Sequence, residues 1–270
     1  LKKGSNLVSF PLNGFVDAMA IITPLINDGI LEKVQDEKGN AIENWGSFNW
    51  INGIGYFSAG EGYIVQVNRD GILTMNNIVE KSSAPTMFNN LETTYFNPKY
   101  YANGWAHMNI NIVGLSNLGL KAFDEIAVYD RNICVGAKKL DDNNFIFDAI
   151  SIPASASEAN LQNGFTEGNP ISIKIWRNDI NEVTQLLPEV LKGEMVFYRQ
   201  GSVFIKLTTI DDISNNVKIF PNPANNIVNI QLHVLPDDGV QMLMQDISGK
   251  TILDFTLTAN QNILDVKDIP

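Results

Sequence analysis

Short runs of alternating apolar and polar residues, separated by turn-forming residues, are the feature that most constrains the fold of this chain. The clearest runs lie at residues 60–68, 124–137 and 227–232. In the second run, two alternating segments flank a polar turn at residues 130–132, which is typical of a β-hairpin. Alternation with a period of two places every other side chain on one face of a strand. The chain is therefore expected to be mainly β, with tandem antiparallel β-sandwich-like modules.

One short helix is expected near the N-terminus. Phe15, Met19, Ile22 and Ile26 recur at helical spacing, which predicts an amphipathic helix in the first module. Pro24 falls inside this pattern. Since proline cannot donate a backbone hydrogen bond, we expect it to kink the helix or to divide it into two pieces.

The length of 270 residues is enough for two or three domains with separate cores. Residues 209–216 form a polar run with the composition of a linker. We therefore predict a β-rich module at residues 1–76, a β-sandwich-like module at residues 77–208, and a small antiparallel domain at residues 217–270.

Charge and cysteine content narrow the classes of function. A net charge of −11 leaves no basic excess to neutralise phosphates, so binding to nucleic acid is not expected. No run of about 18 apolar residues occurs, so no transmembrane segment is expected either. Because Cys134 is the one cysteine, the chain can form no intrachain disulfide. Its place within an alternating run favours a buried, inert thiol.

The sequence offers little catalytic chemistry. The two histidines, His107 and His233, lie far apart and in different predicted modules, and neither a Gly-x-Ser-x-Gly elbow nor a phosphate-binding glycine loop occurs. Paired carboxylates could in principle serve glycoside hydrolysis. Hairpin turns also favour aspartate, and we prefer that explanation for the acidic residues of the second module. These residues are Asp124, Glu125, Asp130, Asp141, Asp142 and Asp148. No catalytic residue is predicted, and the chain is not expected to be an enzyme.

Two oxygen-rich segments are candidates for a calcium site. They are Asp130 with Asn132, and Asp141 with Asp142. Calcium takes six to eight oxygen ligands, and carboxylates and amide carbonyls both supply them. The segments lack the spacing of an EF-hand loop, so solvated turns are the preferred explanation. No other cofactor is expected.

Aromatic residues suggest a sugar-stacking surface. Trp45, Trp50 and Tyr56 lie close together in the first module, and Trp105 is a second candidate beside two tyrosines. Flat apolar rings suit the faces of pyranoses, and the indole N–H can reach a hydroxyl group. In a small sheet module such rings more often pack in the core, and that alternative is preferred.

The end of the chain carries a recognisable order of motifs. Pro221, Asn222 and Pro223 follow a short alternating strand, and a later segment contains Asp246, Gly249 and Lys250 in a turn. This order resembles the type A C-terminal sorting domain of the type IX secretion system of Bacteroidetes. The resemblance implies export to the medium or to the outer-membrane cell surface, with the secretion machinery as a partner. It also implies a further final strand, so the domain is expected to be truncated.

The first two modules have a second resemblance. Residues 4–11, 33–40, 50–55 and 62–68 follow motifs of a module found in secreted and surface-exposed Bacteroidetes proteins, one of them Trp-Ile-Asn-x-Ile-Gly. Residues 124–176 are similar to a β-sandwich-like module that precedes such sorting domains. The resemblance implies a non-catalytic surface, adhesion or ligand-binding segment, with a glycan or a surface protein as its ligand. The alternative is an accessory region, able to bind carbohydrate, of a secreted hydrolase whose catalytic domain lies outside this sequence.

Overall fold

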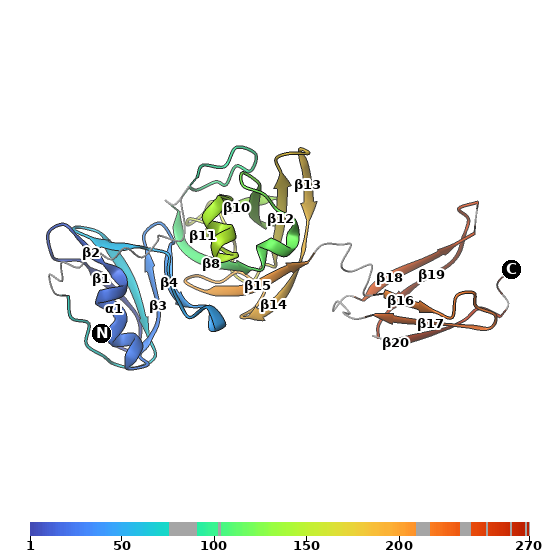
Figure 1. Cartoon of the computed structure of the whole chain (residues 1–270), viewed down its shortest axis with the longest axis horizontal. Helices are drawn as coiled ribbons and strands as arrows, with labels where there is room; N and C mark the ends of the chain where they lie inside the picture. Colours follow the sequence, from blue (N-terminus) through green and yellow to red (C-terminus); the bar gives the residue numbers. More distant parts are fainter. Residues whose placement is uncertain are drawn as a thin grey trace. The chain divides into compact units, whose positions relative to one another are not determined.

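The computed structural model describes residues 1–75, 91–101, 104–208, 217–232, 239–246, 248–259, 261–267 and 269. The chain forms two compact units, Leu1–Leu207 and Thr208–Pro270 (Figure 1). Strands dominate both units, which confirms the predicted mainly β fold class. The predicted linker at residues 209–216 and the predicted boundary after residue 76 lie outside the described residues. Both modules predicted before the linker belong to the first unit.

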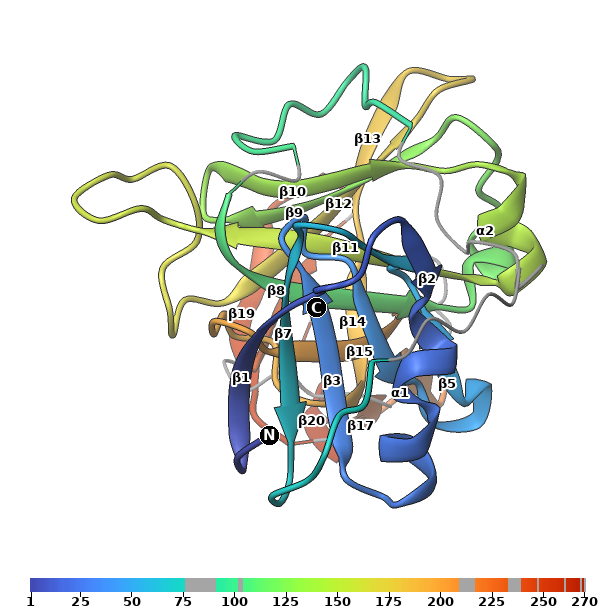
Figure 2. The same ribbon diagram turned by 90° about the vertical axis from the view of Figure 1, so that its left-hand side faces the viewer.

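The first module is built on a five-stranded antiparallel sheet with the order β1-β7-β3-β4-β5 (Figure 2). Its strands are β1 (Gly4–Ser9), β3 (Leu31–Asp36), β4 (Ala41–Asn44), β5 (Trp50–Asn52) and β7 (Gly62–Val67). A smaller sheet pairs β2 (Phe15–Asp17) with β6 (Tyr56–Ser58), and the 3-10 turn η1 (Gly46–Phe48) precedes β5. Val34 and Val65 of the main sheet are fully buried in one core with Ile22 and Leu25 of the helix α1 (Ala18–Asn27).

The helix predicted for the first module is present, but it begins later than predicted, and Pro24 does not divide it into two pieces. Phe15 lies in β2, because the Asp17 carboxylate accepts a hydrogen bond from the Met19 N–H at 2.9 Å and caps a helix that begins after it. Pro24 lies inside one continuous helix of 10 residues. Buried side chains on both sides of the proline, including Leu25, hold the helix against the sheet and offset the missing hydrogen bond.

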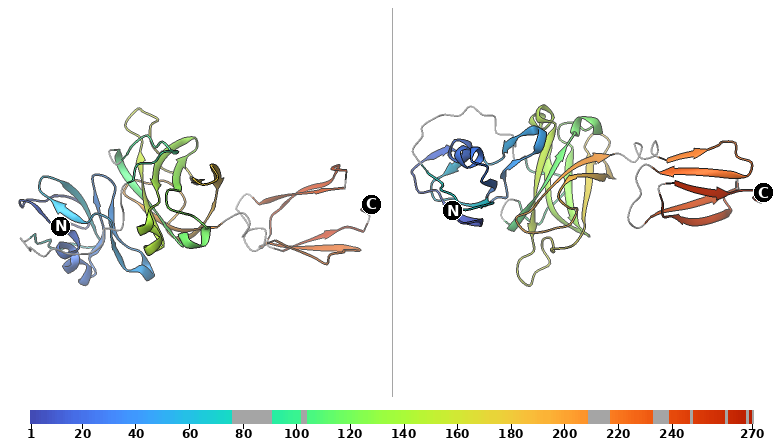
Figure 3. Two further views of the ribbon diagram at one scale, coloured as in Figure 1. Left: turned by 45° about the horizontal axis from the view of Figure 1, so that its top comes forward. Right: turned by 90° about the horizontal axis from the view of Figure 1, so that it is seen from below.

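The second module is a sandwich of two four-stranded sheets, with the orders β10-β9-β12-β13 and β11-β8-β15-β14 (Figure 3). Isoleucines from both sheets meet in its core, among them Ile110, Ile126 and Ile173. Most pairings are antiparallel, but β8 and β15 run parallel, with Ile112 opposite Ile205. The strands are β8 (Trp105–Val113), β9 (Glu125–Asp130), β10 (Ile133–Lys139), β11 (Ala149–Ala156), β12 (Ile171–Arg177), β13 (Glu182–Gln185), β14 (Leu187–Lys192) and β15 (Ser202–Thr208), and the 3-10 turn η2 (Leu115–Leu118) follows β8.

A second helix, α2 (Asp142–Phe147), lies in the second module, where no helix was predicted. Asp141 caps it: its carboxylate accepts from the Asn144 N–H at 3.1 Å, and the Asn144 side chain accepts from the Asp141 N–H at 2.9 Å. The polar residues 141–144, for which a solvated turn was the preferred explanation, are therefore the cap and the first turn of a helix, joined by a capping box.

The second unit consists of two small sheets. One has the order β16-β17-β20, with β16 (Val217–Phe220), β17 (Ile227–Leu232) and β20 (Gln261–Asp265), and the other is the hairpin β18 (Val240–Gln245) and β19 (Thr251–Leu257). Val228, Ile230, Leu232 and Leu257 form its buried core. Alternating runs at residues 218–220, 227–232, 240–247 and 251–257 predict the strands β16, β17, β18 and β19, whereas no strand was predicted at β20.

Candidate functional site

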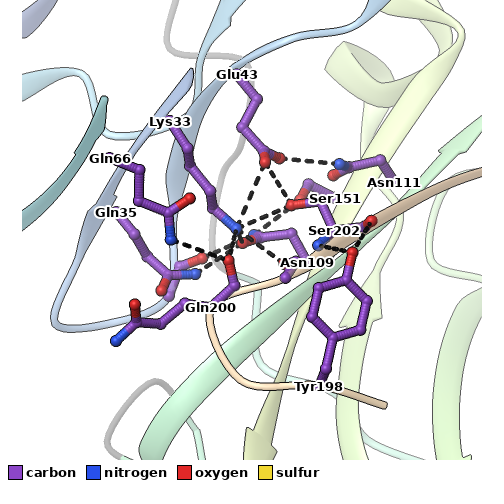
Figure 4. A network of polar contacts seen from close by, with 12 residues as sticks. Lys33, Gln35, Glu43, Gln66, Asn109, Asn111, Ser151, Tyr198, Gln200 and Ser202 are labelled. Atoms are coloured by element: carbon purple, nitrogen blue, oxygen red, sulfur yellow. Dashed lines mark hydrogen bonds and ion pairs between the residues drawn. The ribbon is translucent and has the colours of Figure 1, made fainter. Parts of the chain in front are cut away.

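A buried polar network joins the first module to the second (Figure 4). Lys33 of β3 donates from Nζ to Asn109 Oδ1 at 2.7 Å, to Gly201 O at 2.9 Å and to Ser202 Oγ at 2.9 Å. Lys33 is 3% exposed and Asn109 is 0% exposed. Because a buried ammonium group is costly unless its donors are satisfied, these contacts favour one fixed arrangement of the two modules.

Asn109 of β8 lies at the centre of the network. Its Oδ1 accepts a second hydrogen bond from Gln35 Nε2 at 2.7 Å, while its Nδ2 donates to Gly39 O at 2.8 Å and to Ser151 Oγ at 3.3 Å. Donors surround the oxygen and acceptors surround the nitrogen, so these neighbours determine the orientation of the amide.

Glu43 of β4 is the acidic member of the network. Its Oε1 lies 3.4 Å from Lys33 Nζ and accepts a hydrogen bond from Ser202 Oγ, and its Oε2 accepts from Asn111 Nδ2 at 3.0 Å. Burial lowers the pKa of Lys33, and the Glu43 carboxylate partly opposes that shift. The ion pair of Lys33 and Glu43 is thus almost removed from water. The Lys33 amine contacts both the Glu43 carboxylate and the Asn109 amide.

A cleft of about 740 Å³ opens beside this network, between the two modules. Trp50 from the first module and Tyr198 and Phe204 from the second supply aromatic residues, and Gln66 and Gln200 are the amide-bearing residues of the lining. The remaining lining residues are Leu31, Glu32, Lys33, Glu43, Asn44, Lys192, Gly193, Gly201 and Ser202. Aromatic faces beside amide donors and acceptors suit a ligand with apolar faces and hydroxyl groups.

The other predicted sugar-binding aromatics of the first module lie outside the cleft lining. Trp45 is 7% exposed and packs edge-on against Phe204, with ring centroids 5.8 Å apart. Tyr56 is 37% exposed and packs edge-on against Phe15 at 5.3 Å. Trp45, Trp50 and Tyr56 therefore form no common stacking platform, because only Trp50 lines the cleft, while Trp45 packs against Phe204 and Tyr56 against Phe15.

Trp105 begins β8 and is 63% exposed, so its ring is open to solvent. It does not line the cleft. Tyr100 and Tyr101, which the sequence placed beside it, line a separate pocket of about 220 Å³ with Lys38 and Lys138.

The residues predicted for calcium fall into two separate places. Asp130 and Asn132 line a pocket of about 240 Å³ at one end of β10, and Asp141 and Asp142 follow the other end of that strand. The Asp130 carboxylate accepts from the Thr166 N–H at 2.7 Å and from the Asn169 amide at 2.9 Å. Within the described ranges, no group of three or more His, Cys, Asp and Glu side chains is arranged to hold a metal.

Other carboxylates of the second module hold loops in place. Asp124 accepts from the backbone N–H groups of Lys121 and Asn178, at 2.8 and 2.9 Å. Glu125 is 0% exposed and accepts from the N–H groups of Tyr95 and Phe96, at 3.0 and 2.9 Å.

The remaining candidates for chemistry are unreactive or undescribed. Cys134 is half-buried, and burial raises the pKa of its thiol to about 11, so it stays protonated at neutral pH. His107 is buried in the second module, whereas His233 lies outside the described residues.

The predicted sorting motif lies in the second unit. Pro221, Asn222 and Pro223 form an exposed bend after β16. Asp246 begins the turn between β18 and β19: its carboxylate accepts from the N–H groups of Ser248 and Lys250, at 2.8 and 3.0 Å. Gly249 adopts a positive φ of 84° in this turn, a conformation that glycine tolerates best.

Residues 218–270 match the family model described as the secretion system C-terminal sorting domain. The match indicates export by the type IX secretion system to the secreted or cell-surface-anchored state, and it implies interaction with that machinery. No curated protein and no solved structure matches the chain. Among the residues that the structure describes, no helix is both long and apolar enough to cross a lipid bilayer.

Proposed function

We propose that residues 1–208 form a non-catalytic binding segment of the exported protein and hold a glycan in the cleft between the two modules. The observation that carries this proposal is the cleft lining, in which Trp50, Tyr198 and Phe204 stand beside the amides of Gln66 and Gln200. Sugar rings present apolar faces for stacking and hydroxyl groups for hydrogen bonding, and this lining supplies partners for both.

Contacts among the lining residues hold the walls of the cleft in place, and this supports binding. Gln66 Nε2 donates to Gln200 O at 3.2 Å, and the Tyr198 hydroxyl group donates to Ser202 O at 2.9 Å. Lys192 Nζ lies 5.1 Å from the centroid of the Phe204 ring. These contacts tie residues of the lining to one another, so less conformational entropy is lost when a ligand binds.

The positions of the carboxylates in the cleft and in the second module support a role without catalysis. Glycoside hydrolysis usually needs two carboxylates that face the scissile bond. The carboxylates of the cleft lining belong to Glu32 and Glu43. The Glu43 carboxylate already forms an ion pair with Lys33 and accepts a hydrogen bond from Asn111. The carboxylates of the second module that we describe above hold loops.

A glycan-array screen of the 270-residue chain, with and without calcium, tests the proposal. We expect calcium-independent binding that Trp50→Ala abolishes. Trp105→Ala and Tyr56→Ala serve as matched controls, because these exposed rings lie outside the cleft lining, and they should leave binding unchanged. Circular dichroism of each variant verifies folding.

Three results would contradict the proposal. Binding lost only with Trp105→Ala would place the site at the start of β8. Calcium-dependent binding that Trp50→Ala does not affect would favour the pocket of Asp130 and Asn132. An absence of binding to every glycan would favour a surface protein as the ligand.

A further inference from the structure

The centre of the polar network places an amine against a side-chain amide with little water nearby. Lys33 Nζ lies 2.7 Å from Asn109 Oδ1, and the two residues are 3% and 0% exposed. They come from β3 and β8, in different modules. A fixed contact of this kind gives an amine and a carbonyl group a high effective concentration.

The surroundings of Asn109 polarise its carbonyl group. Gln35 Nε2 donates to Oδ1 at 2.7 Å, in the direction from which it would stabilise negative charge on that oxygen. Preorganised donors of this kind are a principal source of rate enhancement in acyl transfer. Nδ2 is directed to Gly39 O and to Ser151 Oγ, so the nitrogen that would leave faces away from Lys33 Nζ.

Glu43 supplies the acid–base group. Its Oε1 lies 3.4 Å from Lys33 Nζ, close enough to take a proton after a small movement. Burial lowers the pKa of Lys33, which favours the neutral, nucleophilic amine.

We propose that Lys33 and Asn109 form an intramolecular amide bond between the two modules, with Glu43 as the base. The neutral Lys33 Nζ attacks Asn109 Cγ, and the tetrahedral oxyanion is held by Gln35. As the new bond forms, Nζ loses a proton to Glu43. The Cγ–Nδ2 bond then breaks, and this proton is passed on to the leaving nitrogen. The products are the Nζ–Cγ amide and one ammonia, so the step needs no oxidant and no co-reactant.

Such a bond would give this chain a covalent brace that its cysteine content cannot provide. With Cys134 as its one cysteine, the chain cannot form an intrachain disulfide. A cross-link between residues 33 and 109 closes a long loop and reduces the entropy of the unfolded chain, as a disulfide does. It would also fix β3 to β8 permanently, at the place where the modules meet beside the cleft.

Intact-mass spectrometry of the denatured, reduced 270-residue chain tests this proposal directly. We expect a mass lower than the sequence mass by one ammonia. A tryptic digest should contain a branched peptide that joins the segments of Lys33 and Asn109. Lys33→Gln and Glu43→Gln should both restore the full sequence mass. Lys206→Gln, a half-buried lysine of β15 outside the network, should keep the deficit.

The proposal is overturned if the folded wild-type chain has its full sequence mass and gives separate peptides. It is also overturned if Lys33→Gln keeps the deficit, because the ammonia would then come from another reaction, such as cyclisation of an asparagine. The wild-type mass decides the question even if a variant fails to fold. The result is independent of glycan binding.

Discussion

His107 is a residue whose burial has a measurable consequence. It is 4% exposed, and its Nε2 has no hydrogen-bond partner. Burial, and to a lesser extent the charge of Lys33, lowers its pKa to about 4. The folded state therefore keeps a neutral ring at pH values where the unfolded chain, with an ordinary pKa of 6.5, already binds a proton.

We therefore expect stability to fall as the pH drops from about 6.5 to about 4. Above this window both states are neutral at His107, and below it both are protonated. The His107 contribution to the loss is about 3 kcal/mol across the window. Urea denaturation of the wild type and of His107→Gln over this pH range measures it. The variant should show a shallower dependence, and equal slopes would contradict the account.

At the candidate site, the sequence predicted one cleft residue and missed the network beside it. Trp50 was among the predicted aromatics because its residue type and its neighbours suggest sugar stacking. Lys33 and Asn109 lie far apart in the sequence, and neither belongs to a motif with chemical meaning. They meet only because β3 and β8 face each other across the modules, so no local pattern could reveal them. In β8 the polar residues His107, Asn109 and Asn111 alternate with the apolar residues Met108, Ile110 and Ile112, a pattern that predicts a solvent-exposed polar face, whereas all three polar side chains are buried.

At the scale of single elements, α1 offers a direct test of how packing overrides helix propensity. Pro24 is exposed and lies inside the helix, where it cannot donate the usual backbone hydrogen bond. Pro24→Ala should restore that bond and raise the free energy of unfolding by roughly 1 to 3 kcal/mol. Chemical denaturation measures the change, with Asn27→Ala at the exposed end of the helix as the control. A destabilised Pro24→Ala variant would show that the proline fits this helix better than alanine does.

The elements that the sequence predicted well are those with strong alternation. The strands β7, β9, β10 and β17 follow period-two patterns whose apolar residues enter the cores. Two elements were missed because their composition suggests turns or loops. The polar residues at the start of α2 serve as its cap. In β20 most residues are polar, and the apolar Ile263 is 72% exposed, so the strand has no clear apolar face. The parallel pairing of β8 and β15 depends on the topology of the whole sandwich, which local patterns do not specify.

At the scale of the whole molecule, the division into two units predicts separable roles. Removal of residues 209–270 should leave the first unit folded, because its sheets and cores are complete without them. The shortened protein should nevertheless stay inside the cells that normally export it, since residues 218–270 carry the sorting signal. Cell fractionation and immunoblotting measure its location, and the full chain serves as the control. Export of the shortened protein at the normal level would contradict this assignment.

The four tryptophans can report whether the first unit binds its ligand in the cleft between the two modules. Each indole N–H gives its own resonance in a two-dimensional NMR spectrum. Trp50 lines the cleft, Trp45 is buried against Phe204, Trp105 is exposed on β8, and the Trp176 N–H donates to Asn181 at 3.0 Å.

The spectrum should be recorded while a panel of neutral hexasaccharides is titrated into the 270-residue chain. We expect the Trp50 signal to shift in a saturable way, while the signals of Trp105 and Trp176 stay in place. A shift confined to Trp105, or no shift of Trp50 with any sugar of the panel, would contradict binding in the cleft.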